Sequence, residues 1–199
     1  MSQKDIRFSI LAAFLIGVLS LPTINNNLPG YSFNTRILIA LTLIVLTLIG
    51  LTALRFLSRW VSIFWQMAKF IVVGGLNTFL DFAILNLLIA ATGITAGGEF
   101  SLFKALSISV AIINSYLWNK HWTFETKGGG KGEFIEFLIV SLVGLGINVG
   151  SASILVNYVT PFFGLGPVNW ANLSALIATF LGLVWSFLGY KLFVFKKTS

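Results

Sequence analysis

Cysteine is absent from this chain, and histidine occurs once, as His121. The missing thiols exclude disulfides and thiolate metal sites, and a single imidazole excludes a histidine-rich ligand cluster. Charge is also scarce, because Asp, Glu, Lys and Arg make up 10% of the 199 residues, whereas a soluble domain has about a quarter. The sequence holds no paired carboxylates and no Ser/His/Asp set, so we expect no enzyme, no cofactor and no metal site.

Hydrophobic residues, in contrast, make up 57% of the sequence and gather in six long runs. A helix needs about 20 apolar residues to cross the hydrocarbon core of a bilayer, and each run is close to that length or longer. The sequence therefore predicts an all-α fold, a polytopic transmembrane helical bundle with six spans. The expected spans are residues 8–24, 37–54, 70–92, 101–122, 134–159 and 170–193.

Basic residues are concentrated on one side of this predicted bundle. If the N-terminus is cytoplasmic, all of the 13 Lys and Arg residues except Arg36 and Lys104 lie on the inner side. The positive-inside rule then predicts cytoplasmic N- and C-termini and a multi-pass protein of the cell inner (cytoplasmic) membrane. The same asymmetry accounts for the net charge of +7, so we expect membrane lipids, and no nucleic acid, as partners.

An internal repeat relates the third and fourth runs to the fifth and sixth. A shift of 71 positions superposes Asn77 on Asn148 and Lys120 on Lys191, and both copies end in a Lys-x-aromatic-x-Phe phrase. Because the two copies share one orientation, they belong to the parallel class of membrane repeats. The pattern predicts a four-helix core made of two parallel-repeat hairpins at residues 61–199, with residues 1–60 as an additional N-terminal transmembrane hairpin.

Two phrases within the first copy resemble the signature of the GtrA-like family. One is KFIVVGGLNT at residues 69–78, followed by Asp81, and the other is NSYLWNKHWTF at residues 114–124. Lys104 also resembles a lysine that is usual in the family. The resemblance implies a four-helix membrane domain, at residues 61–199, that moves or helps to move polyprenyl-phosphate-linked sugars in cell-surface polysaccharide biosynthesis.

The resemblance also implies partners. These are a polyprenyl-phosphate-linked sugar or bare polyprenyl phosphate, and a membrane-associated polyprenyl-phosphate glycosyltransferase, to which some members are joined. The chain departs from the family pattern in its extra hairpin at residues 1–60. It also departs in its second copy, which has Tyr190 where the first has Asn119.

Asp81 is the acidic residue placed deepest in a predicted span. A charged side chain at the bilayer centre costs about 2.5 to 3.5 kcal/mol on insertion scales, and such residues usually mark a pathway. Asn77 lies one helical turn earlier on the same face, and Asn114 lies at a similar depth in the next span. These residues are candidates for binding the substrate, while the alternative for the asparagines is a purely interhelical hydrogen bond.

Four further candidates lie toward the membrane surfaces. Lys104 is one turn inside the outer face, where it either receives a phosphate or extends to the outer headgroups. Lys120, Lys191 and Asn119 lie at the inner surface, where they either collect an anionic headgroup or serve topology within an aromatic belt.

Three hypotheses follow from these residues. The first is a flippase, or a component that assists translocation, for a polyprenyl-phosphate-linked sugar. The second is a membrane scaffold that recruits a polyprenyl-phosphate glycosyltransferase through its basic surface. The third is a small multidrug-type exporter coupled to protons, in which Asp81 is the titrating acid.

Overall fold

The computed structural model describes residues 2–61, 63–94, 97–126, 132–164 and 167–195. These residues form six α-helices and contain no strand, which confirms the all-α prediction. Short segments named η also occur, two of them π-helical and one 3-10. In chain order the elements are α1 (Gln3–Asn27), α2 (Phe33–Leu57), α3 (Ile63–Thr92), α4 (Gly97–Trp118), η1 (Asn119–Thr123), α5 (Glu133–Tyr158), η2 (Phe162–Gly164), α6 (Pro167–Gly189) and η3 (Tyr190–Val194).

The six helices coincide with the six predicted spans. Among the described residues, α1, α2 and α3 are long and apolar enough to cross a membrane, and 180–194 is a shorter apolar stretch. The helices α4, α5 and α6 have 22, 26 and 23 residues. At a rise of 1.5 Å per residue even α4 is about 33 Å long, which exceeds the roughly 30 Å of a bilayer core.

Helix α1 is longer at both ends than the predicted span. It begins after Ser2, whose hydroxyl accepts a hydrogen bond from the backbone N–H of Asp5 at 3.0 Å. This N-cap pairs one of the backbone N–H groups that have no partner within the first turn of a helix. The helix then continues through Pro22 to Asn27. Proline lacks a backbone N–H, but membrane helices tolerate the lost hydrogen bond where neighbouring helices pack around it.

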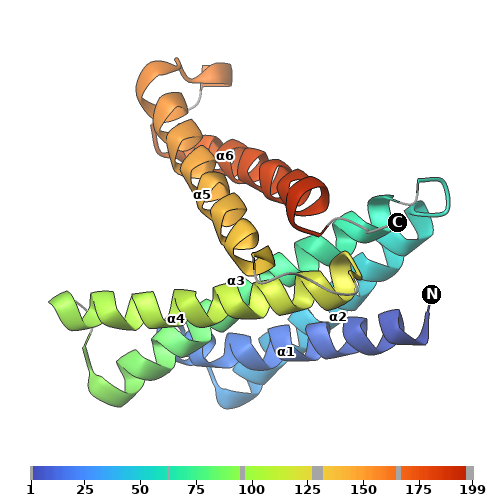
Figure 1. The fold of residues 1–199 in the computed structure, drawn as a ribbon. Helices are drawn as coiled ribbons and strands as arrows, with labels where there is room; N and C mark the ends of the chain where they lie inside the picture. The colour runs from blue at the N-terminus through green and yellow to red at the C-terminus, as the bar shows by residue number, and fades with distance from the viewer. Residues whose placement is uncertain (1, 62, 95–96, 127–131, 165–166, 196–199) are drawn as a thin grey trace. The chain divides into compact units, whose positions relative to one another are not determined.

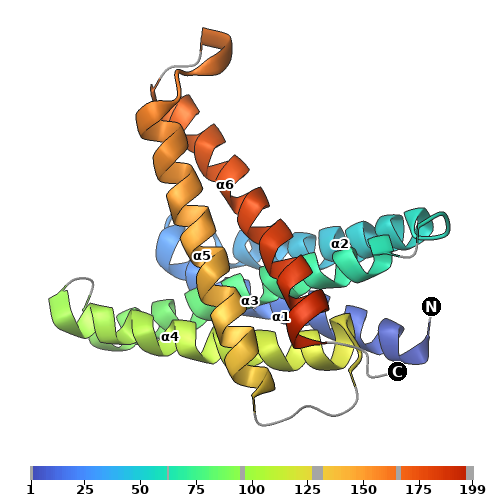
Figure 2. The same ribbon diagram turned by 45° about the horizontal axis from the view of Figure 1, so that its top comes forward.

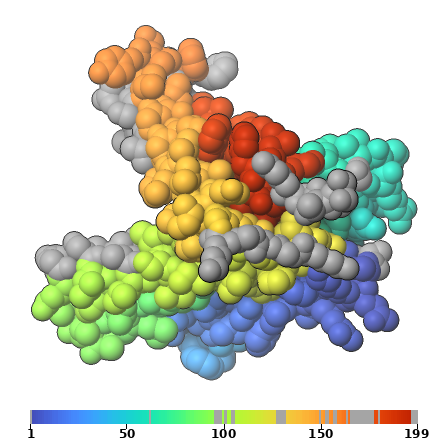
Figure 3. Space-filling model, in the orientation of Figure 1, coloured from blue at the N-terminus to red at the C-terminus, as the bar shows by residue number. Residues whose placement is uncertain are grey.

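The chain forms two compact units, residues 1–125 and 126–199. In unit 1 the central helix is α3, which contacts α1, α2 and α4 (Figures 1 and 2). The space-filling view shows atoms of α4 above those of α1 on one face of this unit (Figure 3). A buried apolar cluster joins the helices, and its members are Ala12, Leu51, Trp65, Ala68, Val73 and Trp122.

Unit 2 is a hairpin in which α5 packs closely against α6 (Figure 2). Glycines allow the close approach, since a Cβ on Gly144 would lie 2.6 Å from Ser186 Oγ, and one on Gly189 would overlap the side chain of Val140. Small residues at helix contacts are the usual basis of association within membranes, where helices gain nothing by leaving the lipid.

The predicted repeat extends to an unusual feature of the backbone. Helix α4 ends in the π-helical segment η1 and helix α6 ends in the π-helical segment η3, at positions that the 71-residue shift superposes. Phe124 N–H donates to Asn119 O at 2.9 Å, and Phe195 N–H donates to Tyr190 O at 2.7 Å. Each half therefore closes with the same five-residue π-turn, a form that is frequent at functional sites.

The division of the chain into an added hairpin at 1–60 and a family domain at 61–199 stays a prediction. The helices α1 and α2 lie in the same compact unit as α3 and α4, and α1 packs against α3 along its length.

Candidate functional site

Polar side chains of α3 and α4 meet in two hydrogen-bonded pairs. Asn114 Nδ2 donates to Asn77 Oδ1 at 2.7 Å, and Ser107 Oγ donates to Asp81 Oδ1 at 2.6 Å. Ser107 is fully buried, and the other three side chains are half-buried. These four residues are called the polar seam below. The sequence predicted Asn77, Asp81 and Asn114 as one group, and the structure brings them together.

The polar seam lies far from the helix ends. Asp81 is about 18 Å along α3 from Lys69 and about 16 Å from the last residue of the helix, Thr92, at 1.5 Å per residue. Polar groups at this depth have no water to bind, so each must find a partner within the protein. The seam is thus a hydrogen-bonding surface within an apolar helix pair.

A buried lysine near the start of α3 forms a second polar centre. Lys69 is 4% exposed, and its ammonium lies 2.8 Å from Glu125 Oε1 and 3.5 Å from Asp5 Oδ1. These three residues are called the ion cluster. They come from the start of α1, the start of α3 and the segment after η1, so these three points lie at one end of unit 1.

The ion cluster was not predicted from the sequence. Lys69 was counted only as a basic residue of the inner surface, and Asp5 and Glu125 were given no role. The available signal was the position of Lys69, which opens the phrase at residues 69–78 and lies inside an apolar helix with no acid one turn away. A lysine in that place needs a distant counter-charge, because an unpaired buried charge is costly.

The π-turn η1 holds several buried polar atoms beside the ion cluster. Gln66 Nε2 donates to the carbonyl of Thr123 at 3.3 Å, which ties α3 to the turn. In the described structure three buried atoms of η1 have no hydrogen-bond partner, namely Asn119 Oδ1, Trp122 Nε1 and Thr123 Oγ1. Buried polar atoms are rarely left without a partner, so three such atoms within five consecutive residues make this turn unusual.

Glu125 has a backbone conformation that is rare for a residue with a side chain. Its φ is 54°, in the left-handed region that costs roughly 1 to 2 kcal/mol for an L-residue. The side chain is 44% exposed. Glu125 therefore reaches the buried Lys69 from a partly exposed and strained position.

The two π-turn lysines are placed alike in the two halves. Lys120 Nζ lies 5.4 Å from the centre of the Tyr116 ring and donates to its hydroxyl at 3.1 Å. Lys191 Nζ lies 5.9 Å from the centre of the Phe187 ring, at the position that the repeat superposes on Tyr116. Each cation is attracted electrostatically by the face of the aromatic ring next to it.

Asn119 and Lys104 are placed differently from the other candidates. Asn119 is 1% exposed, and its Nδ2 donates to the carbonyl of Ser115 at 2.9 Å and to its hydroxyl at 3.3 Å. Its amide thus faces the helix interior beside Lys120. Lys104 lies in α4 three residues before Ser107, and its side chain is outside the described part of the structure.

The opposite end of unit 1 is held by uncharged contacts and one arginine. Asn26 Nδ2 donates to Asn86 Oδ1 at 3.1 Å, which joins α1 to α3. Arg36 donates to the carbonyls of Pro29 at 2.7 Å and Tyr31 at 3.0 Å. The guanidinium therefore stabilises the turn between α1 and α2.

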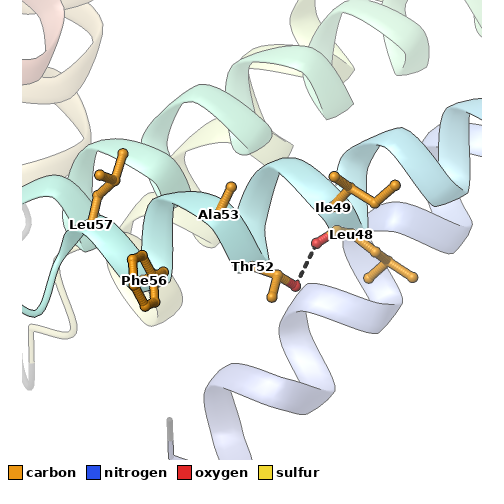
Figure 4. A pocket seen from close by; sticks show the side chains of 6 residues that line it. All are labelled: Leu48, Ile49, Thr52, Ala53, Phe56 and Leu57. Atoms are coloured by element: carbon orange, nitrogen blue, oxygen red, sulfur yellow. Dashed lines mark hydrogen bonds between the residues drawn. The ribbon is translucent and has the colours of Figure 1, made fainter.

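Helix α2 carries an open apolar groove of about 670 Å³. The side chains that line it are shown in Figure 4, and they are Leu48, Ile49, Thr52, Ala53, Phe56 and Leu57. The Thr52 hydroxyl donates to the carbonyl of Leu48 at 2.7 Å, as the dashed line in the figure marks. The lining thus offers hydrocarbon contact, which suits a lipid chain better than a sugar or a phosphate.

The polar seam is not repeated in the second half. The repeat places Ala152 at the position of Asp81, Ala178 at that of Ser107 and Trp185 at that of Asn114, and it keeps only Asn148. Trp185 Nε1 donates to the carbonyl of Val140 at 3.1 Å. The two halves therefore share a fold and a π-turn lysine, but the deep acid belongs to the first half alone.

No group of three His, Cys, Asp or Glu side chains in the described ranges is placed to hold a metal ion. The described residues of the site offer hydrogen bonding in the seam and ionic contact at the end of unit 1.

Comparison with known proteins relates this chain to a protein family and to a bacterial protein. Residues 69–195 match the family described as GtrA/DPMS, transmembrane domain. The protein called "Uncharacterized membrane protein YngA" of Bacillus subtilis (strain 168) is 30% identical over 131 residues, which are 65% of this chain and 78% of that protein. No solved structure matches.

Proposed function

Because the chain belongs to the GtrA/DPMS transmembrane-domain family, we propose that it flips, or helps to flip, a polyprenyl-phosphate-linked sugar across the membrane. Membership supports the broader statement that this is a membrane protein of glycoconjugate biosynthesis, from a family that is generally non-catalytic. The finer proposal assigns it to the assembly of a cell-surface polysaccharide. The direction is from the inner to the outer leaflet of the cytoplasmic membrane, with both termini inside.

The observation that carries this proposal is the bond between Asp81 and Ser107 in the depth of unit 1. A sugar headgroup that crosses the hydrocarbon core must exchange its water for protein hydrogen bonds, because lipid offers none. The seam supplies carboxylate, amide and hydroxyl groups at that depth. An interhelical bond alone needs no carboxylate, since Asn and Ser achieve it at lower cost.

The phosphate is received at the ends of the two halves. Lys120 and Lys191 stand on matched π-turns at the end of α4 and of α6. Both lie on the side that the basic residues mark as cytoplasmic, where an anionic headgroup would be collected before it moves along the seam. Near the outer face of the membrane, Lys104 is the basic residue of α4. It would contact the phosphate as the lipid leaves the protein.

A scaffold is the second candidate, and one surface favours it. At the end of α2 the guanidinium of Arg59 lies 4.9 Å from the centre of the Phe56 ring, and the Phe56 ring meets that of Trp60 edge-on at 5.4 Å. Trp60 is 70% exposed. A cationic and aromatic surface of this kind suits lipid headgroups or a docked glycosyltransferase.

Reconstitution distinguishes the two functions. Purified protein in liposomes should move a labelled short-chain polyprenyl-phosphate sugar between leaflets, and Asp81→Asn should lower that rate at least tenfold. The matched control is Thr78→Val, because Thr78 lies on the same helix outside the seam and its hydroxyl bonds the carbonyl of Gly74. Absence of protein-dependent movement would favour the scaffold, and a full rate for Asp81→Asn would remove the seam from the route.

A further inference from the structure

We propose that Lys69 is the centre of a phosphate-binding site at the end of unit 1, and that the Glu125 carboxylate is a displaceable latch that occupies it. The inference rests on the proposed function, since it adds Lys69 to the two π-turn lysines as a group that binds the lipid phosphate. It assigns a role to the ion cluster, whose residues belong neither to the polar seam nor to the pair of π-turn lysines.

The charges around Lys69 favour a replaceable anion. Lys69 and Arg55 both lie over the Trp65 ring, at 5.8 and 5.4 Å from its centre. Asp5 and Glu125 both contact Lys69, so the four charged groups, Arg55 included, sum to zero. Without Glu125 they sum to +1, with the ammonium of Lys69 buried, and a buried positive charge attracts an anion strongly.

The two acids differ in how firmly they are held. Asp5 is 8% exposed, and its backbone is fixed by the N-cap of Ser2 at the start of α1. Glu125 belongs to no helix, is 44% exposed on its side chain and has a φ of 54°. Strained, partly exposed positions of this kind are typical of clamps and switches. Glu125 is therefore the acid that leaves, and Asp5 is the acid that stays.

Two hydrogen-bond donors lie on the π-turn that leads to Glu125. Glu125 follows η1, where Trp122 Nε1 and Thr123 Oγ1 are buried and have no hydrogen-bond partner within the described residues. Thr123 is held against α3 by Gln66, three residues before Lys69. Bare polyprenyl phosphate is a phosphate monoester with three acceptor oxygens, which suit an ammonium, an indole N–H and a hydroxyl. A carboxylate has only two, as has the phosphodiester of a linked sugar, so bare polyprenyl phosphate is the better occupant once Glu125 has moved.

The test measures binding to the full-length protein in detergent micelles. The probes are farnesyl phosphate, inorganic phosphate and farnesol, and the readout is tryptophan fluorescence, because Trp65 lies beside Lys69. We expect Glu125→Gln to tighten farnesyl phosphate binding at least threefold, and Asp5→Asn/Lys69→Gln to weaken it at least tenfold. This double variant removes both charges of the pair, so that neither is left buried alone. The matched control is Glu136→Gln, an exposed acid in the first turn of α5, which should leave the affinity unchanged.

The outcomes separate a latch from a structural ion pair. If Glu125→Gln lowers the melting temperature and leaves the affinity for farnesyl phosphate unchanged, Glu125 is only a structural partner and the latch is refuted. Tightening of farnesyl phosphate alone identifies a lipid phosphate, whereas equal tightening of inorganic phosphate identifies a free-phosphate site and contradicts a lipid occupant. Binding of farnesol as strong as that of farnesyl phosphate would also overturn the proposal.

The same variants distinguish this inference from the proposed function. If Glu125→Gln tightens binding and the liposomes show no flipping, the latch stands and the flippase fails. If flipping depends on Asp81 but farnesyl phosphate affinity does not respond to Glu125 or Lys69, the flippase stands and the latch fails.

Discussion

Asp5 of α1 lies 3.5 Å from Lys69 of α3, so the N-terminal hairpin and the first repeat hairpin share a buried ion pair. Their apolar surfaces are joined as well, because Phe8 packs on the rings of Trp118 and Trp122 at 5.4 and 6.0 Å. The N-terminal hairpin therefore contributes directly to the packing of α3 and α4.

Removal of residues 1–60 should accordingly destabilise the rest of unit 1. Lys69 would lose Asp5, and the apolar cluster would lose Ala12 and Leu51. We expect a chain that starts at residue 61 to aggregate or to melt well below the full chain. In the full chain, Asp5→Asn should cost about 1 to 3 kcal/mol, the usual range for a lost partner of a buried polar group.

Size-exclusion profiles and thermal unfolding in detergent measure both effects. A matched substitution at an exposed site of the same helix, Lys4→Gln, serves as the control. If the shortened chain purified as one species with the melting temperature of the full chain, α1 and α2 would be an independent addition.

The asparagine pair of the seam should be measurable as a coupling energy. Asn114 donates to Asn77 at 2.7 Å, and interhelical hydrogen bonds in membranes contribute about 0.6 kcal/mol on average and up to about 1.7. A double-mutant cycle of Asn77→Leu and Asn114→Leu should yield a coupling in this range. A cycle of Asn77→Leu with Thr78→Val should yield none, and equal values for the two cycles would contradict the pairing.

Sequence reasoning predicted the local part of this arrangement. The spacing of Asn77 and Asp81 placed them on one helical face, and the position of Asn114 midway along the next span placed it at a similar depth. Length and hydropathy predicted the six helices, because both properties are local to each run. The family resemblance was predicted from two phrases of the first half and is confirmed.

What the sequence could not predict depends on distant partners. Lys69 meets Asp5 and Glu125, which are far from it in the chain, and neither acid is distinguished by its own neighbours. The π-turns likewise have no compositional signature, since Asn119 and Tyr190 begin them with unrelated side chains. The continuation of α1 beyond residue 24 to Asn27 was not predicted, because Pro22 and the asparagines at 25–27 are typical of a turn.

The stability of the α5–α6 hairpin should depend on Gly144 and not on the nearby Gly146. A Cβ on Gly144 would lie 2.6 Å from Ser186 Oγ, whereas a Cβ on Gly146 meets nothing within 4 Å. We expect Gly144→Ala to destabilise the protein by about 1 to 3 kcal/mol through overpacking. Gly146→Ala should be neutral or stabilise it by up to roughly 1 kcal/mol, because alanine favours a helix. Denaturation in mixed micelles compares the two, and equal stabilities would show that the hairpin is loosely packed.

The proposed topology can be tested with single cysteines, because the natural chain has none. Gly30 and Gly132 are suitable sites, since a Cβ on either meets nothing within 4 Å. An impermeant maleimide should label Gly30→Cys in intact cells. It should label Gly132→Cys only after the membrane is opened. The reverse pattern would invert the orientation that the basic residues predict.

Substitution of Asp81 distinguishes a transport role from a structural one. Asparagine keeps the shape of the side chain and still accepts the hydrogen bond of Ser107, so Asp81→Asn should be made at normal abundance and melt within about 1 kcal/mol of the natural chain. Leucine removes the acceptor and leaves the buried Ser107 hydroxyl without this contact, so Asp81→Leu should cost roughly 1 to 3 kcal/mol.

If the carboxylate acts on the substrate, both variants fail to restore surface glycan in a deletion strain, although only the leucine variant is unstable. If Asp81 merely joins α3 to α4, the asparagine variant restores the glycan fully and the leucine variant fails in proportion to its lost abundance. Quantitative immunoblots from the same cultures separate these cases. Complementation by Asp81→Asn at natural abundance would therefore exclude the charge from the mechanism, and it would equally exclude a proton-coupled exporter in which this acid titrates.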